Sequence, residues 1–392
     1  MQVLPPRDTT EKDDQRLSKG QHASMTERLD QLTSLRFFAA AAIVAVHIQQ
    51  VILRIPGTDW LGWGVSFFFV LSGFILTYVY GDMSGKTTSR FFVARIARLW
   101  PLHAFMLVAH FGFVWDWNVT KLGPQTFSNA LMLHAWIPSL NFSLSHNAVS
   151  WSISAEIFFY LLFPFAARSK HLWLWILVFL VIPAALSYWI NSNFNWLNEI
   201  MRNPLPAFLS KSPYGSAVEF LVGVGAGRIY IATKGRRLIP DVAWTWLEII
   251  SISLLVASAA SISDVSTWVG RVTVLPLGFW FSHSGGMLVF AGLIYTMAMG
   301  RGVISNALKA RPLILLGEIS FAIYMTHWTI IHFVRRKASQ WQWQPFMMAL
   351  VVIVVTLAVS YVLWRFLEMP ARSWIISRFD RRSGRLKRAQ PD

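Results

Sequence analysis

Cysteine is absent from this chain and charge is scarce. With no Cys among 392 residues, the sequence excludes disulfides, a thiol nucleophile, thiolate-bound zinc and Cys-ligated iron–sulfur clusters. Charged residues make up 14% of the chain, whereas a soluble domain has about 25%. Hydrophobic residues make up 55%, against about 45–50% in a soluble domain. One water-soluble core would not hide this much apolar surface, so the composition predicts an integral membrane protein. The 20 Trp residues agree, because indole suits the bilayer interface.

Several familiar motifs are also missing. The sequence has no H-E-x-x-H, Walker A or G-x-S-x-G pattern, and we predict no metal site. Five residues separate His110 from Asp116, so the two do not form an H-x4-D motif. Gly223, Gly225 and Gly227 lie inside an apolar run, where small residues favour close helix packing over dinucleotide binding.

Long apolar runs dominate what is present. A membrane-spanning helix needs about 20 mostly apolar residues, and ten segments qualify, which predicts an all-α polytopic membrane protein. Residues 1–31 lack the apolar region of a cleavable signal peptide, so we expect a disordered cytoplasmic tail there, and a basic cytoplasmic tail over 373–392. The predicted spans cover residues 35–54, 61–80, 99–116, 148–166, 171–190, 214–232, 242–262, 284–300, 313–334 and 345–367.

Positive charge sets the expected orientation. The net charge is +16, and 27 of the 35 Lys and Arg residues fall on one side of the membrane if ten helices cross it. Because cytoplasmic loops are rich in Lys and Arg, both termini are expected in the cytoplasm, at a plasma (bacterial inner) membrane. Lys and Arg side chains that face anionic lipid explain the net positive charge, so we predict no nucleic-acid partner. Arg335, Arg336 and Lys337 fall on the other side: either they serve an extracytoplasmic anion or the ninth span is misplaced.

Three ionisable residues lie inside predicted spans, where they are costly and therefore usually functional. His47, Glu156 and His327 stand in the first, fourth and ninth spans. From a rise of about 1.5 Å per residue, all three are expected between mid-membrane and the outer leaflet. An imidazole and a carboxylate at one depth can form a general base with its orienting partner, so we expect Glu156 to pair with His47 or with a nearby cationic group on the acceptor side. The structural alternative is an interhelical hydrogen bond at each position.

A second group of charges lies at the expected cytoplasmic surface. Arg90, Arg95 and Arg98 stand in the run SRFFVARIARLWP, and the last two share one helix face. Guanidinium forks suit phosphate groups. The alternative is the ordinary positive charge of a cytoplasmic loop.

Taken together, these motifs resemble the membrane-bound acyltransferase 3 family, which O-acylates glycans and other hydroxyl compounds. The resemblance covers about residues 32–372, with the motifs in the family's order, and Phe321 stands where the family commonly has Tyr. The matching segments are Arg36 with His47, FFFVLSGFIL at 67–76, Arg95 with Arg98, WSISAEIFFYLLFP with Glu156, ISFAIYMTH at 319–327, and Glu368 with Pro370 and Arg372.

The resemblance implies a transmembrane acyltransferase domain over 32–372 that takes acyl-CoA, acetyl-CoA in the simplest case, from the cytoplasm. The acceptor would be a hydroxyl group of an extracytoplasmic or lipid-linked glycan, or of another compound. His47 would act as general base or acyl carrier. The other implied site residues are Glu156 and Arg36 at the catalytic centre, Arg90, Arg95 and Arg98 at the donor phosphates, and His327, Tyr324, Glu368 and Arg372 as further candidates.

Two other classes of protein stay open at this point. A proton-coupled transporter or flippase of a glycan or organic anion would also carry intramembrane His, Glu and Arg. A binding or scaffold protein is the third possibility, but it does not explain ionisable residues at one depth in three helices. The ordered motifs favour the enzyme, and release of free CoA would separate it from a transporter.

Overall fold

All regular structure in the described part of the chain is helical. The computed structural model describes residues 27–55, 58–81, 83, 88–113, 123–193, 205–236 and 239–388, and no strand occurs within these ranges. This confirms the predicted all-α class. Most of the expected N-terminal tail, residues 1–26, lies outside the described residues.

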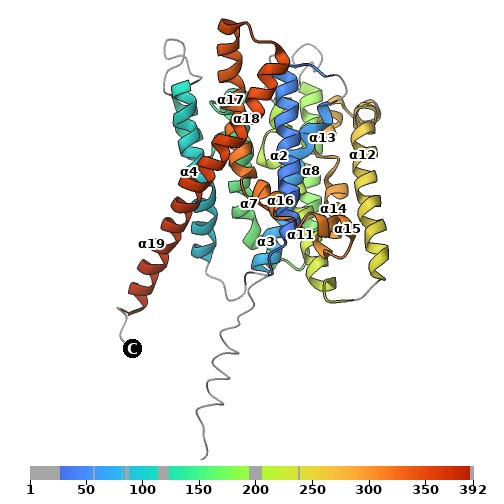
Figure 1. Cartoon of the computed structure of the whole chain (residues 1–392). Coiled ribbons are helices and arrows are strands. Elements are labelled where there is room, and N and C mark those ends of the chain that lie inside the picture. Colours follow the sequence, from blue (N-terminus) through green and yellow to red (C-terminus); the bar gives the residue numbers. More distant parts are fainter. Residues whose placement is uncertain are drawn as a thin grey trace, which may run out of the picture.

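The long helices stand side by side and cross the molecule from end to end (Figure 1). Among the described residues nine helices are long and apolar enough to span a membrane, or ten if a pair bent by 56° forms one span. The chain is therefore an integral membrane protein with about the predicted number of spans. The single helices are α2 (Asp30–Val51), α3 (Gly64–Tyr80), α4 (Thr88–Phe113), α7 (Trp151–Arg168), α8 (Leu172–Asn193), α11 (Pro213–Thr233) and α12 (Asp241–Val272).

Three further spans are interrupted. α13 (Leu275–Ser284) continues as α14 (Met287–Met299), and the bent pair consists of α16 (Arg311–Glu318) and α17 (Ser320–Trp341). α18 (Pro345–Leu363) passes through a π-helical turn, η4 (Trp364–Glu368), into α19 (Met369–Arg388). The region predicted as a C-terminal tail is therefore helical up to residue 388, with no break at the expected domain end.

The start of α2 and the end of α19 lie at the same end of the helix array, at the bottom of Figure 1. We call this end the termini face and the other end the opposite face. Short helices cover the opposite face between the spans: η1 (Asp59–Trp63), α5 (Pro124–Ala130), η2 (His134–Trp136), α6 (Leu140–Ser143), η3 (Ala148–Ser150) and α10 (Leu205–Ser210). At the termini face α15 (Val303–Ala307) connects α14 to α16.

The ninth span lies where the sequence predicts it. α17 runs on to Trp341, and α18 begins at Pro345 after a short turn at the top of Figure 1. Arg335, Arg336 and Lys337 therefore belong to the end of α17 at the opposite face. Their position is not the result of a misplaced span.

Close contact between α3 and α11 builds the centre of the domain. A Cβ atom at Gly223 would lie 2.0 Å from Val70 O, and one at Gly73 would lie 2.0 Å from Phe220 O. Only glycine lets the two backbones approach this closely. The interpretation of Gly223 as a packing residue is confirmed.

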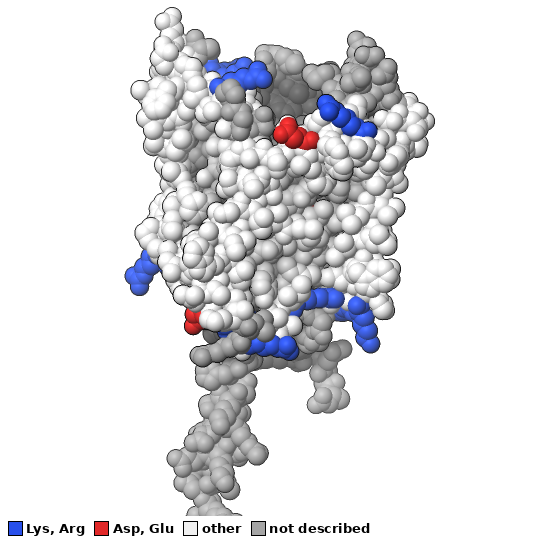
Figure 2. All heavy atoms as spheres, turned by 90° about the vertical axis from the view of Figure 1, so that its right-hand side faces the viewer, with Lys and Arg blue, Asp and Glu red and all other residues white. Residues whose placement is uncertain are grey.

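The outer surface is suited to lipid. In the most hydrophobic part of α12 only 6% of residues are buried inside the protein, and Trp246 and Trp268 are 63% and 62% exposed. These two indoles are 22 residues apart in sequence, or about 33 Å along a helix, close to the thickness of a bilayer core. Figure 2, which shows this side, has its Lys, Arg, Asp and Glu residues toward the two ends and a broad uncharged band between them.

Candidate active site

A cavity of about 350 Å³ lies between α2, α3, α4, α7 and the start of α17. It extends from Glu27 and Tyr78, at the termini face, to Ser152 and Tyr324 in the interior. Its walls are largely apolar, with Phe68, Leu71, Ile75 and Leu99 among them, but Arg36, Arg95, Arg98 and Glu156 also line it. Three of the predicted arginines and the predicted carboxylate therefore share one cavity.

The arginines come from two neighbouring helices. Arg36 lies in the second turn of α2, and Arg95 and Arg98 share one face of α4. Arg95 is only 9% exposed and donates from Nη2 to the hydroxyl oxygen of Tyr80, at 3.2 Å. Its Nε atom has no hydrogen-bond partner among the described residues. A buried guanidinium with an unused donor is prepared for an anion.

The C-terminal motif joins this arginine cluster. Glu368 ends the π-helical turn beside α4 and interacts electrostatically with Arg98, Arg36 and Arg372. Arg372 in turn interacts with Arg95. Positive charge is in excess here, because four arginines, at 36, 95, 98 and 372, surround two carboxylates. Turns of π-helix are often found at functional sites.

Glu156 belongs to the arginine cluster and does not contact the first-span histidine. Its Oε1 atom accepts hydrogen bonds from Tyr160 (2.7 Å) and Ser72 (3.2 Å), and its charge acts on Arg36 and Arg98. The predicted pairing of Glu156 with His47 is wrong. Of the alternative, a cationic group on the acceptor side, only the positive charge is found: the cations near Glu156 are Arg36 and Arg98, which line the cavity.

Glu156 also lies at a different depth from the one predicted. Asn147, just before α7, donates from Nδ2 to Met325 O at 2.8 Å, and the Ser152 and Tyr324 hydroxyls are 2.7 Å apart. The start of α7 therefore lies beside the middle of α17. Glu156, one turn further along, lies about 10 Å closer to the termini face than His327.

His47 pairs with His327 instead. Nδ1 of His47 lies 2.9 Å from Nε2 of His327, and the two rings stack with their centroids 5.1 Å apart. Trp328 packs against His47 in a T-shaped arrangement, with the ring centroids 5.1 Å apart. His327 is completely buried, whereas His47 is partly exposed. The two histidines that the sequence placed at one depth are thus in direct contact.

The contacts of His327 decide which nitrogen of His47 carries the proton. Nδ1 of His327 lies 3.2 Å from the carbonyl oxygen of Ile323, which only accepts hydrogen bonds. In a neutral His327 the proton is therefore on Nδ1, and Nε2 accepts from Nδ1–H of His47. This leaves the lone pair of His47 on Nε2, the nitrogen that faces away from His327.

Tyr324 connects the cavity to the histidine pair. Its hydroxyl lies 2.8 Å from Val149 O and 2.7 Å from Ser152 Oγ, and its ring is 5.9 Å from that of His327. Because Tyr324 lines the cavity and precedes His327 by one helical turn, the cavity ends within one turn of the histidines.

Arg90 does not line the cavity. Its Nη2 atom forms an ion pair with Asp380 of α19 at 3.0 Å, and both side chains are exposed, at 64% and 41%. An exposed pair of this kind contributes little to stability. The geometry therefore gives no support to a donor-binding role for Arg90.

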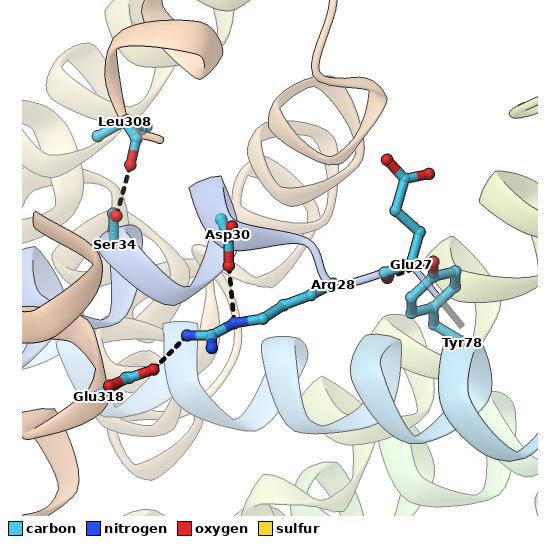
Figure 3. A network of polar contacts seen from close by, with 7 residues as sticks. All are labelled: Glu27, Arg28, Asp30, Ser34, Tyr78, Leu308 and Glu318. Atoms are coloured by element: carbon cyan, nitrogen blue, oxygen red, sulfur yellow. Dashed lines mark hydrogen bonds and ion pairs between the residues drawn. The ribbon is translucent and has the colours of Figure 1, made fainter. Parts of the chain in front are cut away.

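Sequence reasoning missed the network at the termini-face end of the cavity (Figure 3). Arg28 forms ion pairs with Asp30 and with Glu318 of α16, and the Tyr78 hydroxyl donates to the Glu27 carbonyl oxygen at 2.7 Å. These contacts hold the segment before α2 across the cavity end. The only signal in the sequence is a polar stretch of the predicted tail, which gave no reason to expect a site.

The described residues contain no group of His, Asp and Glu that could hold a metal ion.

Comparison with known proteins identifies the family. Residues 29–365 match the acyltransferase domain family Acyl_transf_3. The chain is 28% identical to acyltransferase MdmB of Streptomyces mycarofaciens, over 88% of this chain and 91% of the relative. It is 23% identical to O-acetyltransferase OatA of Staphylococcus aureus, over 87% of this chain and 57% of the relative. No solved structure matches the chain. With a match over most of its length, the chain belongs to the acyltransferase 3 family of membrane proteins.

Proposed function

We propose that this acyltransferase takes an acyl group, acetyl in the simplest case, from cytoplasmic acyl-CoA and transfers it to a hydroxyl group of an extracytoplasmic or lipid-linked glycan. One observation carries the proposal: a cavity rich in arginine ends within one helical turn of a histidine with a free lone pair. The name O-acetyltransferase of the relative OatA supports the acyl group and the hydroxyl acceptor.

The arginines explain the choice of donor. CoA carries a pyrophosphate and a further phosphate, and planar guanidinium forks bind phosphate with two parallel hydrogen bonds. Arg36, Arg95 and Arg98 supply the positive charge, and the apolar walls between them and Tyr324 suit the long pantetheine arm. The excess of Lys and Arg at the termini face supports a cytoplasmic position for this end.

His47 then provides the base. The acceptor hydroxyl attacks the thioester carbonyl carbon, its proton passes to Nε2 of His47, and the carbon–sulfur bond breaks. The departing thiolate takes the proton back, so the products are an ester and free CoA. His327 keeps the imidazole in the required tautomer, as the contact with Ile323 O indicates.

Release of CoA tests the proposal. Purified protein in lipid nanodiscs, given acetyl-CoA and a methyl hexoside as the hydroxyl acceptor, should release a free thiol as the acetyl ester forms. Because the chain has no cysteine, a thiol reagent reports CoA alone. His47→Ala should abolish the release while the protein still inserts and elutes as wild type. If wild-type protein moved acetyl-CoA or a glycan across the membrane without cleaving the thioester, the transporter alternative would be correct.

A further inference from the structure

A second cluster of ionisable groups lies beyond the far end of the cavity, on the side of the opposite face. It consists of Lys211, Glu219 and His283, from the α10–α11 turn, α11 and α13. None of the three lines the arginine cavity, but Val65 does, and its neighbour Ser66 faces the Glu219 carboxylate. The positive charge of Lys211 also acts on His47. The cluster therefore lies within electrostatic range of the proposed base, on the side away from the arginines.

The backbone around Lys211 is rigid. Ser212 caps α11 by accepting from the Gly215 amide at 3.3 Å, and the indole of Trp280 donates to the Gly215 carbonyl at 2.8 Å. A Cβ atom at Gly215 would lie 1.7 Å from Leu209 O, so the backbone at Gly215 packs directly against the end of α10 and leaves no room for a side chain. From this fixed turn the Lys211 ammonium reaches inward over the ring of Trp151, at 4.9 Å.

The charges of the cluster are not fully used inside the protein. Glu219 is only 2% exposed, and its Oε2 atom has no hydrogen-bond partner among the described residues. Ser66 and Ser284 face the same carboxylate, and Lys211 forms no ion pair with it in the part of the chain that the structure describes. A buried carboxylate oxygen and an ammonium that remain apart are costly in a membrane domain. This cost indicates a ligand that forms hydrogen bonds with both the Glu219 carboxylate and the Lys211 ammonium.

The charge balance indicates what that ligand is. The arginine cluster has excess positive charge and suits an anion, whereas Lys211 and Glu219 cancel and suit a neutral molecule. A hydroxyl group both donates and accepts hydrogen bonds, so adjacent hydroxyl groups can donate to Glu219 and accept from Lys211. Lys211, His47 and His283 are partly exposed, which gives such a ligand access to the base.

We propose that Lys211 and Glu219 form the subsite that holds the acceptor, a neutral polyhydroxyl compound such as a sugar ring, with one hydroxyl group next to Nε2 of His47. The proposal rests on the acyl-transfer function proposed above. It adds that donor and acceptor occupy separate sites on two sides of His47.

Access to the subsite is tested first, without any need to know the natural acceptor. Lys211→Cys introduces the only cysteine of the chain. In sealed vesicles of both orientations, a membrane-impermeant methanethiosulfonate should label Cys only from the opposite face. No labelling, or labelling from the termini face alone, would overturn the proposal.

Kinetics then test binding, with methyl hexosides as acceptor probes. Released CoA is separated by chromatography and quantified, because the introduced cysteine would also react with a thiol reagent. Lys211→Cys and Glu219→Gln should each raise the KM for the probe by about 10- to 100-fold, the effect of losing a hydrogen bond to a charged group, and leave the KM for acetyl-CoA within about twofold. Aminoethyl methanethiosulfonate restores an ammonium group and should rescue Lys211→Cys, whereas methyl methanethiosulfonate should not.

Two matched controls separate this role from a structural one. Lys337→Cys removes a lysine at the same face, and Glu248→Gln changes a fully buried glutamate that accepts from the Ile304 amide at 2.9 Å. Neither should alter the KM for the probe. An unchanged probe KM in the Lys211 and Glu219 variants, or equal rescue by both reagents, would overturn the subsite. Failure of wild-type protein to cleave acetyl-CoA under any condition would instead contradict the proposed function.

Discussion

At the scale of single residues, the site depends on which hydrogen bonds hold the ionisable groups. His327 is completely buried and contacts both His47 and a carbonyl oxygen, so under the proposed function it would act on the reaction through His47. Glu156 is anchored by Tyr160 and Ser72 among arginines. The two residues should therefore affect different steps, and kinetics can tell them apart.

Removing His327 should lower kcat and leave the donor KM unchanged. His327→Ala takes away the acceptor of the His47 Nδ1–H bond, so the base loses its fixed tautomer and orientation, and a loss of about 10²- to 10⁴-fold is expected. His327→Gln offers a carbonyl oxygen to the same proton and should retain part of the rate. Steady-state kinetics of CoA release measure both. Equal loss in the two variants would show that this hydrogen bond does not matter.

Glu156 and Arg98 should act on donor binding as one unit. Glu156→Gln keeps the hydrogen bonds but removes the charge that faces Arg98, and Arg98→Ala removes a phosphate partner, so each should raise the KM for acetyl-CoA. In the double variant the two effects should not add, with a coupling of about 0.5–3 kcal/mol. Additive effects, or a change in kcat alone, would contradict this assignment.

The sequence could predict the residue types of the site but not all of its pairs. Arg36, Arg95, Arg98 and Glu156 were expected and share a cavity. The pairing of Glu156 with His47 failed because the prediction counted depth from the expected ends of the spans. The short helices η2, α6 and η3 set the start of α7 against the middle of α17, and no periodicity in the sequence encodes that shift.

At the scale of helices, packing is decided by a few small residues. The sequence predicted the close packing at Gly223 because glycines interrupt an otherwise apolar run, and α3 is the partner. It did not predict the bend between α16 and α17, the length of α12 or the π-helical turn, since a hydropathy pattern does not record helix geometry.

Gly223→Ala should destabilise the domain. The new methyl group would lie 2.0 Å from Val70 O, so α3 and α11 must separate, and overpacking of this kind costs about 1–3 kcal/mol. Thermal unfolding of the detergent-purified protein should show a lowered Tm. Gly225→Ala is the matched control on the same helix, because its nearest neighbour, Leu172 Cδ2, lies 3.7 Å away. Equal Tm values for the two variants would contradict the packing argument.

At the scale of the whole molecule, the proposed function assigns the two ends of the helix array to different substrates. The arginine-lined cavity begins at the termini face, and the Lys211 cluster lies toward the opposite face. Under the proposed function, orientation in the membrane would therefore decide which substrate comes from which compartment.

Single cysteines test the orientation. We expect Arg236→Cys, at the termini face, to resist a membrane-impermeant thiol reagent in intact cells, and Arg335→Cys, at the opposite face, to react with it. Both residues are exposed, so the difference reports the side of the membrane. The reverse pattern would place both termini outside and contradict a cytoplasmic donor.

The end wall of the cavity has a consequence for the length of the acyl group. Ser152, Phe321 and Tyr324 line the far end, and the Tyr324 hydroxyl is fixed by contacts with Val149 O and Ser152. A wall held in this way would limit the length of the acyl group, because each methylene group that does not fit lowers the binding free energy by about 1–3 kcal/mol. The chain length that the enzyme accepts would then be set by α17, the same helix that carries His327, and one element would both position the base and measure the group it transfers.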